Sequence, residues 1–560
     1  MRINNIKRIA SAALSACMLM SMSAYAYSDP NYGPWIMSQQ SGTTTETSVP
    51  ASEPASDSAS AEVSSAPGSE AEVQTADSTA VQTDTAQVTG APGSDQTGTT
   101  SSDQVDLTGA PGESLQIDVS DLILSVPDGS SKDSIYSAPI GLKALTEAGI
   151  AAWHAAGGDG HVQADPVMGR VPAVHVQMLQ TDGNLTAGFT TNMEAFSCPT
   201  DGFTGLKLRL EDGTGDVFYR VYTNEHGWSK WAMNEMITPY SGDQAKVRAV
   251  QMRINGYTRN LYNFYYRAIL NDGTSLGWAH DGQTAGALGK DQYIQALEVR
   301  LWKTGCSFND NTSGYLLADN SEGVIVGADG SVSYSRFDGS AYTGWGYDTE
   351  NNKYYFKDNV PVTGWQYIGD YKYYFDETGK VVTDLEPVMG LTGDYKIRIN
   401  KDMKTLTVYT KDGSNGYIIP YKVILVTIGS DTPIGTFKTY ADYRWKFMHD
   451  DIYCQYLLRI KDGFLLHSII FYGAPDSYHL TASTFNQLGK NQSDGCIRML
   501  SGDAAWVFNN CGLNTSVEIY NDKWVMGPLD RPAISWVIPD TQCYDPTDPE
   551  VIQAQLAAKG

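Results

Sequence analysis

The sequence predicts a multidomain protein that is mainly β, with a disordered linker in its N-terminal part. Three observations lead to this prediction. Short runs of alternating apolar and polar residues, or of β-branched residues, recur after residue 134, and such runs are typical of strands. Two sets of internal repeats occur in the same region, and repeats indicate small units that stack on one another. Between residues 27 and 133 the composition is too polar to form an apolar core.

Residues 1–26 are predicted to be a secretory signal peptide. A basic start precedes an apolar run that is too short to span a membrane, and Ala24-Tyr25-Ala26 follows as a small-x-small cleavage site. The basic residues are Arg2, Lys7 and Arg8. The segment Leu14-Ser15-Ala16-Cys17 offers an alternative, a lipobox with lipidation at Cys17. Either route takes the protein out of the cytoplasm, without a transmembrane span in the mature chain.

Residues 27–133 are predicted to be a disordered linker of Ser, Thr, Ala, Gly, Pro and acidic residues. Between Arg8 and Lys132 the chain has no Lys or Arg. The acidic residues here contribute to the net charge of -25, which disfavours nucleic acid as a partner. We interpret the segment as a solvated spacer that gives the following domains reach.

Residues 134–305 contain three repeated units with a period of about 45 residues. Arg209, Arg253 and Arg300 occupy the same place in each unit, at the end of a strand-like run. The sequence therefore predicts a β module with pseudo-threefold symmetry. The Gly-Trp pairs and the segment Asp281–Gly286 resemble the clostridial hydrophobic repeat with a conserved Trp, which implies attachment to a surface or a polysaccharide. The alternative is that the tryptophans simply form the core; they are Trp228, Trp231 and Trp278.

Residues 306–384 contain a shorter repeat. Thr343-Gly344-Trp345 recurs 20 residues later as Thr363-Gly364-Trp365. Each unit is predicted to be a β-hairpin, and single hairpins must stack to be stable. The pattern resembles the choline- or glucan-binding repeat of cell-wall proteins, in which aromatic side chains form cages for choline or sugar. The resemblance implies Trp345, Tyr355, Trp365 and Tyr374 as ligand-binding residues for cell-wall polysaccharide or a choline-like ligand. With so few units, a spacer role is the alternative.

The strongest functional signal is the segment Ser493–Met499, which reads Ser-Asp-Gly-Cys-Ile-Arg-Met. A cysteine attacks as a thiolate, so it needs a base or a nearby positive charge. His467 lies upstream and supplies a candidate base. Gly495 has no Cβ, so the backbone can approach an acyl group, and the amides of Gly495 and Cys496 could stabilise an oxyanion. Each residue alone is more often a buried structural residue; together they indicate an acyl-transfer site.

These residues resemble the catalytic signature of the L,D-transpeptidase (YkuD-type) family, an upstream His followed by Ser-His-Gly-Cys-(Ile/Val)-Arg. The resemblance implies Cys496 as nucleophile and His467 as general base. The sequence departs from the pattern at Asp494, whose carboxylate should raise the pKa of the thiol. The remaining implied roles concern substrate and loop: Ser493 would orient the thiol or substrate, Arg498 would hold the loop or bind a carboxylate, and Tyr453 would line the donor groove or pack in the core.

Residues 385–522 are predicted to form the catalytic domain, and the resemblance implies a β-sandwich with Cys and His at one end of the sheets. Thr432–Phe437 looks like a segment at the edge of the family's active site. A helix is expected to begin at Ser501 as N-cap and to end at Gly512. Residues 523–560 are predicted to be an extended C-terminal tail.

The cysteines and histidines show no spacing typical of a metal site, so no metal and no cofactor are predicted. Cys454 and Cys511 both lie in the catalytic domain and could pair, although sequence does not determine disulfide connectivity.

The sequence therefore predicts a secreted, wall-associated L,D-transpeptidase of a Gram-positive-type bacterium. As the family implies, it would use peptidoglycan stem peptides and form 3→3 cross-links through a thioester on Cys496. Two alternatives remain. The same site could serve an L,D-carboxypeptidase, in which water replaces the acceptor amine, or the chain could be a wall-binding protein whose catalytic domain has decayed.

Overall fold

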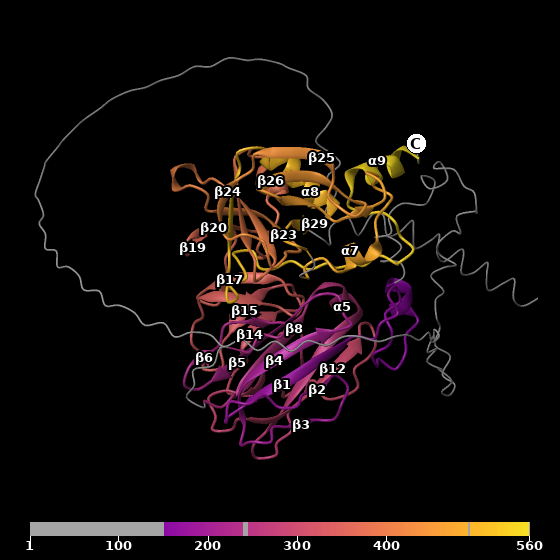
Figure 1. Ribbon diagram of the computed structural model, residues 1–560. Coiled ribbons are helices and arrows are strands. Elements are labelled where there is room, and N and C mark those ends of the chain that lie inside the picture. Colours follow the sequence, from indigo (N-terminus) through magenta and orange to yellow (C-terminus); the bar gives the residue numbers. More distant parts are fainter. Residues whose placement is uncertain (1–149, 239–244, 491–492, 559–560) are drawn as a thin grey trace, which may run out of the picture. The chain divides into compact units, whose positions relative to one another are not determined.

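The computed structural model describes residues 150–238, 245–490 and 493–558 (Figure 1). The predicted signal peptide (1–26), the linker (27–133) and the alternative lipidation site Cys17 lie outside the described residues. The described part is mainly β, as the sequence predicted, with many short sheets and few helices. None of the helices in the described ranges is both long and apolar enough to cross a membrane.

Three antiparallel pairs of long strands form the first module, one pair for each sequence repeat. The pairs are β1 (Ala173–Gln180) with β4 (Phe203–Glu211), β5 (Val217–Thr223) with β8 (Ala249–Ile254), and β9 (Tyr262–Leu270) with β12 (Ile294–Lys303). Arg209, Arg253 and Arg300 each lie on the second strand of their pair. The shorter elements are β2 (Phe189–Thr190), β3 (Phe196–Ser197), β6 (Gly227–Trp228), β7 (Ala232–Met233), α5 (Gly256–Leu261), β10 (Ala279–His280), β11 (Ala285–Ala287) and β13 (Leu316–Leu317).

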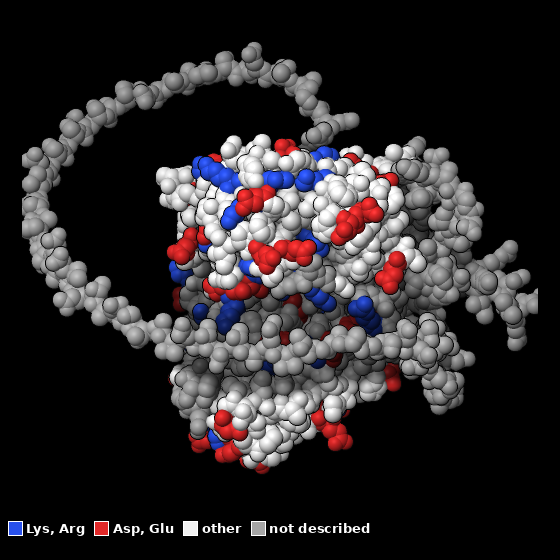
Figure 2. Space-filling model, viewed as in Figure 1, with Lys and Arg blue, Asp and Glu red and all other residues white. Residues whose placement is uncertain are grey.

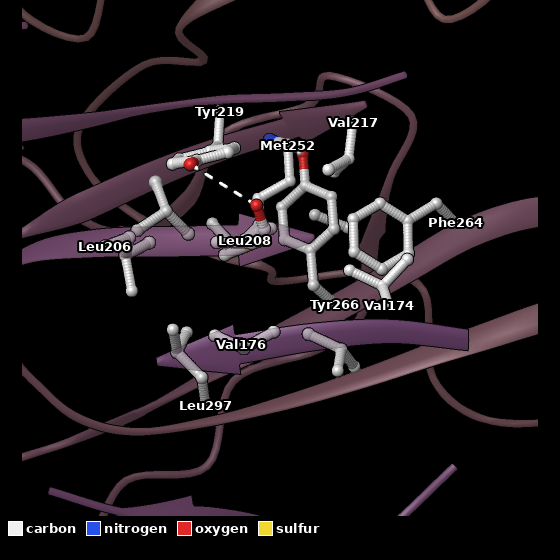
Figure 3. Packing of buried hydrophobic residues seen from close by; sticks show 14 of the residues in the cluster. Val174, Val176, Leu206, Leu208, Val217, Tyr219, Met252, Phe264, Tyr266 and Leu297 are labelled. Atoms are coloured by element: carbon white, nitrogen blue, oxygen red, sulfur yellow. Dashed lines mark hydrogen bonds between the residues drawn. The ribbon is translucent and has the colours of Figure 1, made fainter. Parts of the chain in front are cut away.

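The three pairs bury one common apolar core (Figure 3). Alternate residues of each strand point inward, so every pair contributes; examples are Val176, Leu208, Tyr219, Met252, Tyr266 and Leu297. The period-2 pattern of the sequence therefore has its usual cause, a strand with one face turned to the core.

The repeat tryptophans differ in their exposure. Trp278 is buried, with the guanidinium groups of Arg267 and Arg300 4.8 and 4.4 Å from its ring centroid. Trp228 and Trp231 are half-buried, and Arg220 lies 4.6 and 4.8 Å from their rings. Stacking of Arg on Trp is a stabilising contact in its own right. Trp278 therefore packs as a core residue, whereas the other two keep part of their surface.

Three β-hairpins follow and stack in chain order. They are β14 (Gly323–Val326) with β15 (Val332–Ser335), β16 (Gly344–Tyr347) with β17 (Lys353–Lys357) and the short β18 (Val360–Pro361), and β19 (Gly364–Ile368) with β20 (Tyr371–Phe375). Tyr334 of the first hairpin meets Phe356 of the second, with ring centroids 5.4 Å apart. Trp345 of the second meets Tyr373 of the third at 5.1 Å. Aromatic stacking between neighbours thus replaces the core that one hairpin lacks.

The C-terminal part contains two five-stranded sheets that share a core with helix α8. The first sheet has the order β23-β22-β21-β30-β24 and the second β25-β26-β27-β29, with β28 beside β26. The strands are β21 (Tyr395–Asn400), β22 (Thr405–Thr410), β23 (Ile419–Leu425), β24 (Gly435–Lys438), β25 (Ala441–Phe447), β26 (Ile452–Lys461), β27 (Phe464–Ser468), β28 (Phe471–Tyr472), β29 (Ile497–Met499) and β30 (Ser516–Tyr520). The helices are α6 (Glu386–Met389), η1 (Gly413–Asn415), α7 (Ala482–Asn486), α8 (Ser501–Cys511) and α9 (Pro549–Ala557). The result is a layered β structure in which α8 packs against β26 and β27 (Figure 1).

Helix α8 starts where the sequence predicted, but its cap differs. Leu500 holds the N-cap position, and its side chain makes no capping bond. The backbone N–H of Ser501 instead donates to Asp545 at 2.7 Å, and that of Gly502 donates to Thr547 Oγ1 at 3.0 Å. Side chains from the tail thus bind the free N–H groups at this helix end. Ser501 was therefore the wrong N-cap.

Two further expectations for the C-terminal region need correction. The tail was predicted to be extended, but Pro549–Ala557 form helix α9, with Asp548 as an N-cap that accepts from the Glu550 N–H. Cys454 and Cys511 do not pair, because both are buried free thiols.

Candidate active site

Parallel pairing of β27 with β29 brings the two predicted catalytic residues together. His467 lies in register with Arg498, and Leu466 with Ile497. Extending this register by one residue places Cys496 beside Leu465. Because side chains alternate between the two faces of a strand, Leu465, His467, Cys496 and Arg498 share one face of the sheet. The upstream histidine and the cysteine are thus neighbours across the two strands.

This face of the sheet opens into a cavity of 450 Å³. His467, Cys496 and Arg498 line it together with Asp494. The other lining residues come from β25, β26, β27 and the turns beside them: Lys446, Phe447, Met448, His449, Ile452, Cys454, Arg459, Gly463, Phe464, Leu465 and Ile470. A concave site with a nucleophile and a base is the usual setting for catalysis.

His467 is buried and is held in one tautomer. Its Nδ1 lies 2.6 Å from the carbonyl oxygen of Ser468. A carbonyl oxygen only accepts, so Nδ1 carries the proton and donates, and Nε2 is the unprotonated nitrogen. Burial, and secondarily the charge of Arg498, lowers the pKa of His467 to about 3. At neutral pH His467 is therefore an uncharged base.

Cys496 is also uncharged at neutral pH. Burial raises the pKa of its thiol above the usual value, and the carboxylate of Asp494 adds to this. The N–H of Leu465 and the charges of Arg498 and Arg459 oppose the rise but do not cancel it. The S–H points to the carbonyl oxygen of Gly463, 3.7 Å from Sγ. The pair therefore rests as thiol and imidazole, and proton transfer must accompany attack.

The neutral pair predicts a particular pH profile for alkylation of Cys496 by iodoacetamide. The rate should rise about tenfold per pH unit from neutral pH to beyond pH 9, because only the thiolate reacts. Asp494→Asn should raise the rate throughout this range, since it removes a charge that raises the pKa. Mass spectrometry of the peptide that contains Cys496 measures the rate. A rate plateau around neutral pH would mean a preformed thiolate–imidazolium pair and would contradict this assignment.

The loop before Cys496 is held in a conformation that only glycine adopts easily. Gly495 has φ +136°, and a Cβ there would lie 2.4 Å from Cε1 of Phe464. Ser493 Oγ donates to the carbonyl oxygen of Cys496 at 2.7 Å and accepts from the Gly495 N–H at 3.3 Å. Thr432 Oγ1 donates to the carbonyl oxygen of Gly495 at 2.7 Å. These bonds fix the backbone that presents the thiol to the cavity.

Gly495→Ala should therefore lower the acylation rate of Cys496 at least about tenfold, because the new methyl group forces the loop to move. Gly463→Ala is the matched control. Gly463 lies in the neighbouring turn, and a Cβ there would meet no atom within 4 Å. Stopped-flow acylation and thermal unfolding of both variants measure the effect. Equal acylation rates in the two variants would show that acylation does not depend on this loop conformation.

The structure places the other predicted site residues in different settings. Asp494 is exposed at the edge of the cavity. The backbone of Arg498 is hydrogen-bonded to that of Thr427. The Thr427 N–H donates to the Arg498 carbonyl oxygen at 2.8 Å, and the Arg498 N–H donates to the Thr427 carbonyl oxygen at 3.0 Å. Tyr453 packs edge-on against Phe447, with ring centroids 5.4 Å apart, and is not among the cavity residues; Cys454 lines the cavity instead. Ser493 bonds to the backbone of its own loop, not to the thiol.

Comparison with known families agrees with this geometry. Residues 394–519 match the L,D-transpeptidase catalytic domain (YkuD). The match covers the strands of both C-terminal sheets and includes His467 and Cys496. It confirms the resemblance seen in the sequence and supports an enzyme of the peptidoglycan L,D-transpeptidase type. The repeat modules lie outside the matched residues.

Solved structures similar to the chain cover only a limited share of it. A fused Zn-dependent amidase/peptidase/peptidoglycan-binding protein from Clostridium acetobutylicum is 20% identical, with 23% of this chain and 52% of that chain covered and a TM-score of 0.17. An L,D-transpeptidase from Mycobacterium smegmatis is 21% identical, over 23% and 58%, with a TM-score of 0.18. L,D-transpeptidase 1 from Mycobacterium tuberculosis is 20% identical, over 22% and 61%, with a TM-score of 0.16. The chain thus spans between half and two thirds of these proteins. No curated protein matches the chain.

Sequence reasoning missed several groups that shape the candidate site. The carbonyl of Ser468, the N–H of Leu465 and the hydroxyl of Thr432 act on His467, Cys496 and the loop. Only Thr432 had a sequence signal, because it begins the Thr-Pro-x-Gly-x-Phe segment. Backbone groups leave no residue pattern, so the other two could not be found without the strand pairing.

The predicted wall-ligand aromatics lie on the stacked hairpins. Trp345 packs between hairpins, against Tyr355 and Tyr373 with ring centroids 5.1 Å away in each case. Trp365 and Tyr374 are paired across β19 and β20, with Trp365 37% exposed. Only the last hairpin therefore presents a tryptophan with a large free surface.

Within the described residues, no group of three or more His, Cys, Asp or Glu side chains is placed to hold a metal ion.

Proposed function

We propose that this chain is an L,D-transpeptidase that forms 3→3 peptidoglycan cross-links through a thioester on Cys496. The observation that carries the proposal is the pair His467 and Cys496, which share one sheet face and one cavity within the residues that match the transpeptidase family. The single tautomer of His467 leaves Nε2 as the nitrogen that accepts a proton.

In the first half-reaction, Sγ of Cys496 attacks the carbonyl of the third stem-peptide residue, and Nε2 of His467 takes the thiol proton. The bond to the terminal D-Ala breaks, and His467 returns the proton to the leaving amine. In the second half-reaction, the side-chain amine of another stem peptide attacks the thioester. It loses one proton, Cys496 regains a thiol, and one amide bond has been exchanged for another without oxidation or reduction.

The same site supports the carboxypeptidase alternative if water replaces the amine. Product analysis separates the possibilities. Purified protein is incubated with stem tetrapeptide fragments, and the products are identified by liquid chromatography with mass spectrometry. The proposal predicts a 3→3 linked dimer. Free tripeptide as the main product would indicate a carboxypeptidase, and unchanged donor with folded protein would indicate the decayed wall-binding protein.

Secretion and wall attachment are part of the proposal. The sequence of residues 1–26 supports export, and the two repeat modules support retention at wall polymer. The exposed ring of Trp365 and its neighbour Tyr374 form the surface best suited to stack on a sugar or a choline-like cation. Binding of purified protein to isolated cell walls, with and without Trp365→Ala, tests this part.

A further inference from the structure

The cavity beside Cys496 differs in charge from the chain as a whole. The net charge of the chain is -25, and the face drawn in Figure 2 shows acidic and basic side chains intermixed. The cavity, however, is lined by Lys446, Arg459 and Arg498 against a single carboxylate, that of Asp494. Because the cavity walls exclude part of the solvent, a local excess of positive charge there attracts anions strongly.

Arg459 is placed to act next to the thiol. It pairs across β26 and β27 with Leu465, and Leu465 is the neighbour of Cys496 in the register of β27 with β29. The three residues thus form one row across the sheet, on the cavity face. Two strand spacings separate the Cα atoms of Arg459 and Cys496 by about 10 Å. The long side chain of arginine can bridge most of that distance, and Arg459 does lower the pKa of Cys496.

The guanidinium of Arg459 has no carboxylate partner among the described residues. Its Nε is buried and donates no hydrogen bond to any described group. The guanidinium carbon of Arg459 lies 5.6 Å from the ring centroid of Tyr443. A buried donor without a partner costs free energy, and a bound water, ion or ligand group is one way in which that cost is removed.

Lys446, on the neighbouring strand β25, is another cation that lines the cavity. It lies opposite Cys454, another cavity residue, and its Nζ is 4.9 Å from the ring centroid of Tyr443. It too forms no ion pair with a described residue. Several basic side chains elsewhere are paired, such as Lys396 with Glu518 at 2.8 Å, Lys372 with Asp412 at 2.7 Å and Arg444 with Glu550. The cavity thus brings together two cations, Arg459 and Lys446, that have no ion-pair partner among the described residues.

We propose that Arg459 and Lys446 form a binding subsite for a carboxylate of the acyl donor. The inference rests on the proposed function for the identity of that donor. A guanidinium presents two parallel N–H donors that match a carboxylate, and a lysine adds a second positive charge. The subsite would hold an anionic peptide with its scissile carbonyl near Cys496, and Arg459 would act as a positioning residue.

The first test uses two small thiol reagents and needs no peptide substrate. Iodoacetate carries a carboxylate, whereas iodoacetamide is its neutral analogue of similar size. The rate ratio of the two reagents at Cys496, measured at one pH, cancels the fraction of thiolate. Arg459→Gln should lower the iodoacetate/iodoacetamide ratio about tenfold. Lys446→Gln should lower it in the same direction.

The matched control is Lys461→Gln, because Lys461 is an exposed cation on the same strand that does not line the cavity. Its ratio should stay at the wild-type value. An unchanged ratio in Arg459→Gln, or an equal fall in Lys461→Gln, would overturn the subsite. Thermal unfolding of each variant shows that the compared proteins are folded.

The second test identifies the carboxylate. Stem tetrapeptide donors are compared with their analogues amidated either at the terminal residue or at the side chain of the third residue. Arg459→Gln should raise the KM of the free donor about tenfold, with a smaller change in kcat, and should not affect the analogue whose amidation removes the bound carboxylate. Arg459→Lys should restore part of the loss. Equal effects on all three donors would contradict carboxylate binding. If no donor reacts, the proposed function fails, while the reagent ratio still decides the subsite.

Discussion

Replacing Cys496 with alanine is expected to abolish turnover of stem tetrapeptide, with a loss of at least about 10⁴-fold. The reason is chemical: the proposed thioester needs Sγ of Cys496, and the other thiol that lines the cavity, that of Cys454, is buried and has a raised pKa. Gly463, Leu465 and His467 surround the thiol with a backbone carbonyl, a backbone N–H and a base, none of which is a nucleophile for an amide. Turnover is measured by mass spectrometry of the released D-Ala.

Cys454→Ala is the matched control for this experiment. Cys454 lines the same cavity, but its side chain is buried and burial holds the pKa of its thiol far above the usual range. It should therefore be unreactive, and its removal should change turnover less than about tenfold. If Cys454→Ala lost turnover and Cys496→Ala retained it, the assignment of the nucleophile would be wrong.

The second large effect is expected for His467→Gln, which should lower the acylation rate by about 10²- to 10⁴-fold. At neutral pH the thiol is protonated, so attack needs a base, and Nε2 of His467 is the nitrogen left unprotonated by the bond from Nδ1 to Ser468. The pKa of His467, lowered to about 3, means that the base stays deprotonated down to acid pH. Wild-type acylation should therefore show no fall at the usual pKa of histidine, near 6.5.

His449→Gln provides the control, because His449 lines the same cavity but is exposed and bonded to Asp450. Its acylation rate should stay near the wild-type rate. The remaining activity of His467→Gln should rise with pH, since hydroxide or prior ionisation of the thiol then replaces the missing base. A variant at His467 that acylates at the wild-type rate would show that the proton leaves by another route.

Sequence reasoning worked best where the chemistry is local. Cys496, Gly495 and the flanking Ser493 and Arg498 lie within one short segment, so residue type and spacing were enough to indicate an acyl-transfer site. His467 lies 29 residues earlier; thiol chemistry made it a candidate base, and the family pattern supplied its specific role. The parallel pairing of β27 with β29 explains why so distant a residue lies next to the thiol.

Features that depend on pairing between distant strands could not be predicted. Arg459 shows no motif, and its place beside the thiol follows only from two strand registers, those of β26 with β27 and of β27 with β29. Tyr453 was predicted to line the groove or to pack in the core, and it is the neighbouring Cys454 that lines the cavity. Because side chains alternate along a strand, an error of one residue exchanges the two faces.

Helix ends also show that local features could be predicted from the sequence, whereas contacts between distant residues could not. The sequence around Ser501 contains a reasonable local cap, but the structure uses Asp545 and Thr547, which follow more than forty residues later. Helix α9 could have been found, because Asp548 and Pro549 form a regular N-cap and N1 pair. The hairpin repeats were predicted from local periodicity, whereas burial of Trp278 depends on which strands enclose it.

The most direct test of the account is to trap the acyl-enzyme. The protein is mixed with a stem tetrapeptide in the absence of an acceptor, quenched in acid at short times, and analysed by intact mass and peptide mapping. The account predicts a mass increase equal to the donor without its terminal D-Ala, located on the peptide that contains Cys496 and absent in Cys496→Ala. An adduct on another residue, an adduct that retains the terminal D-Ala, or no adduct on folded protein would contradict it.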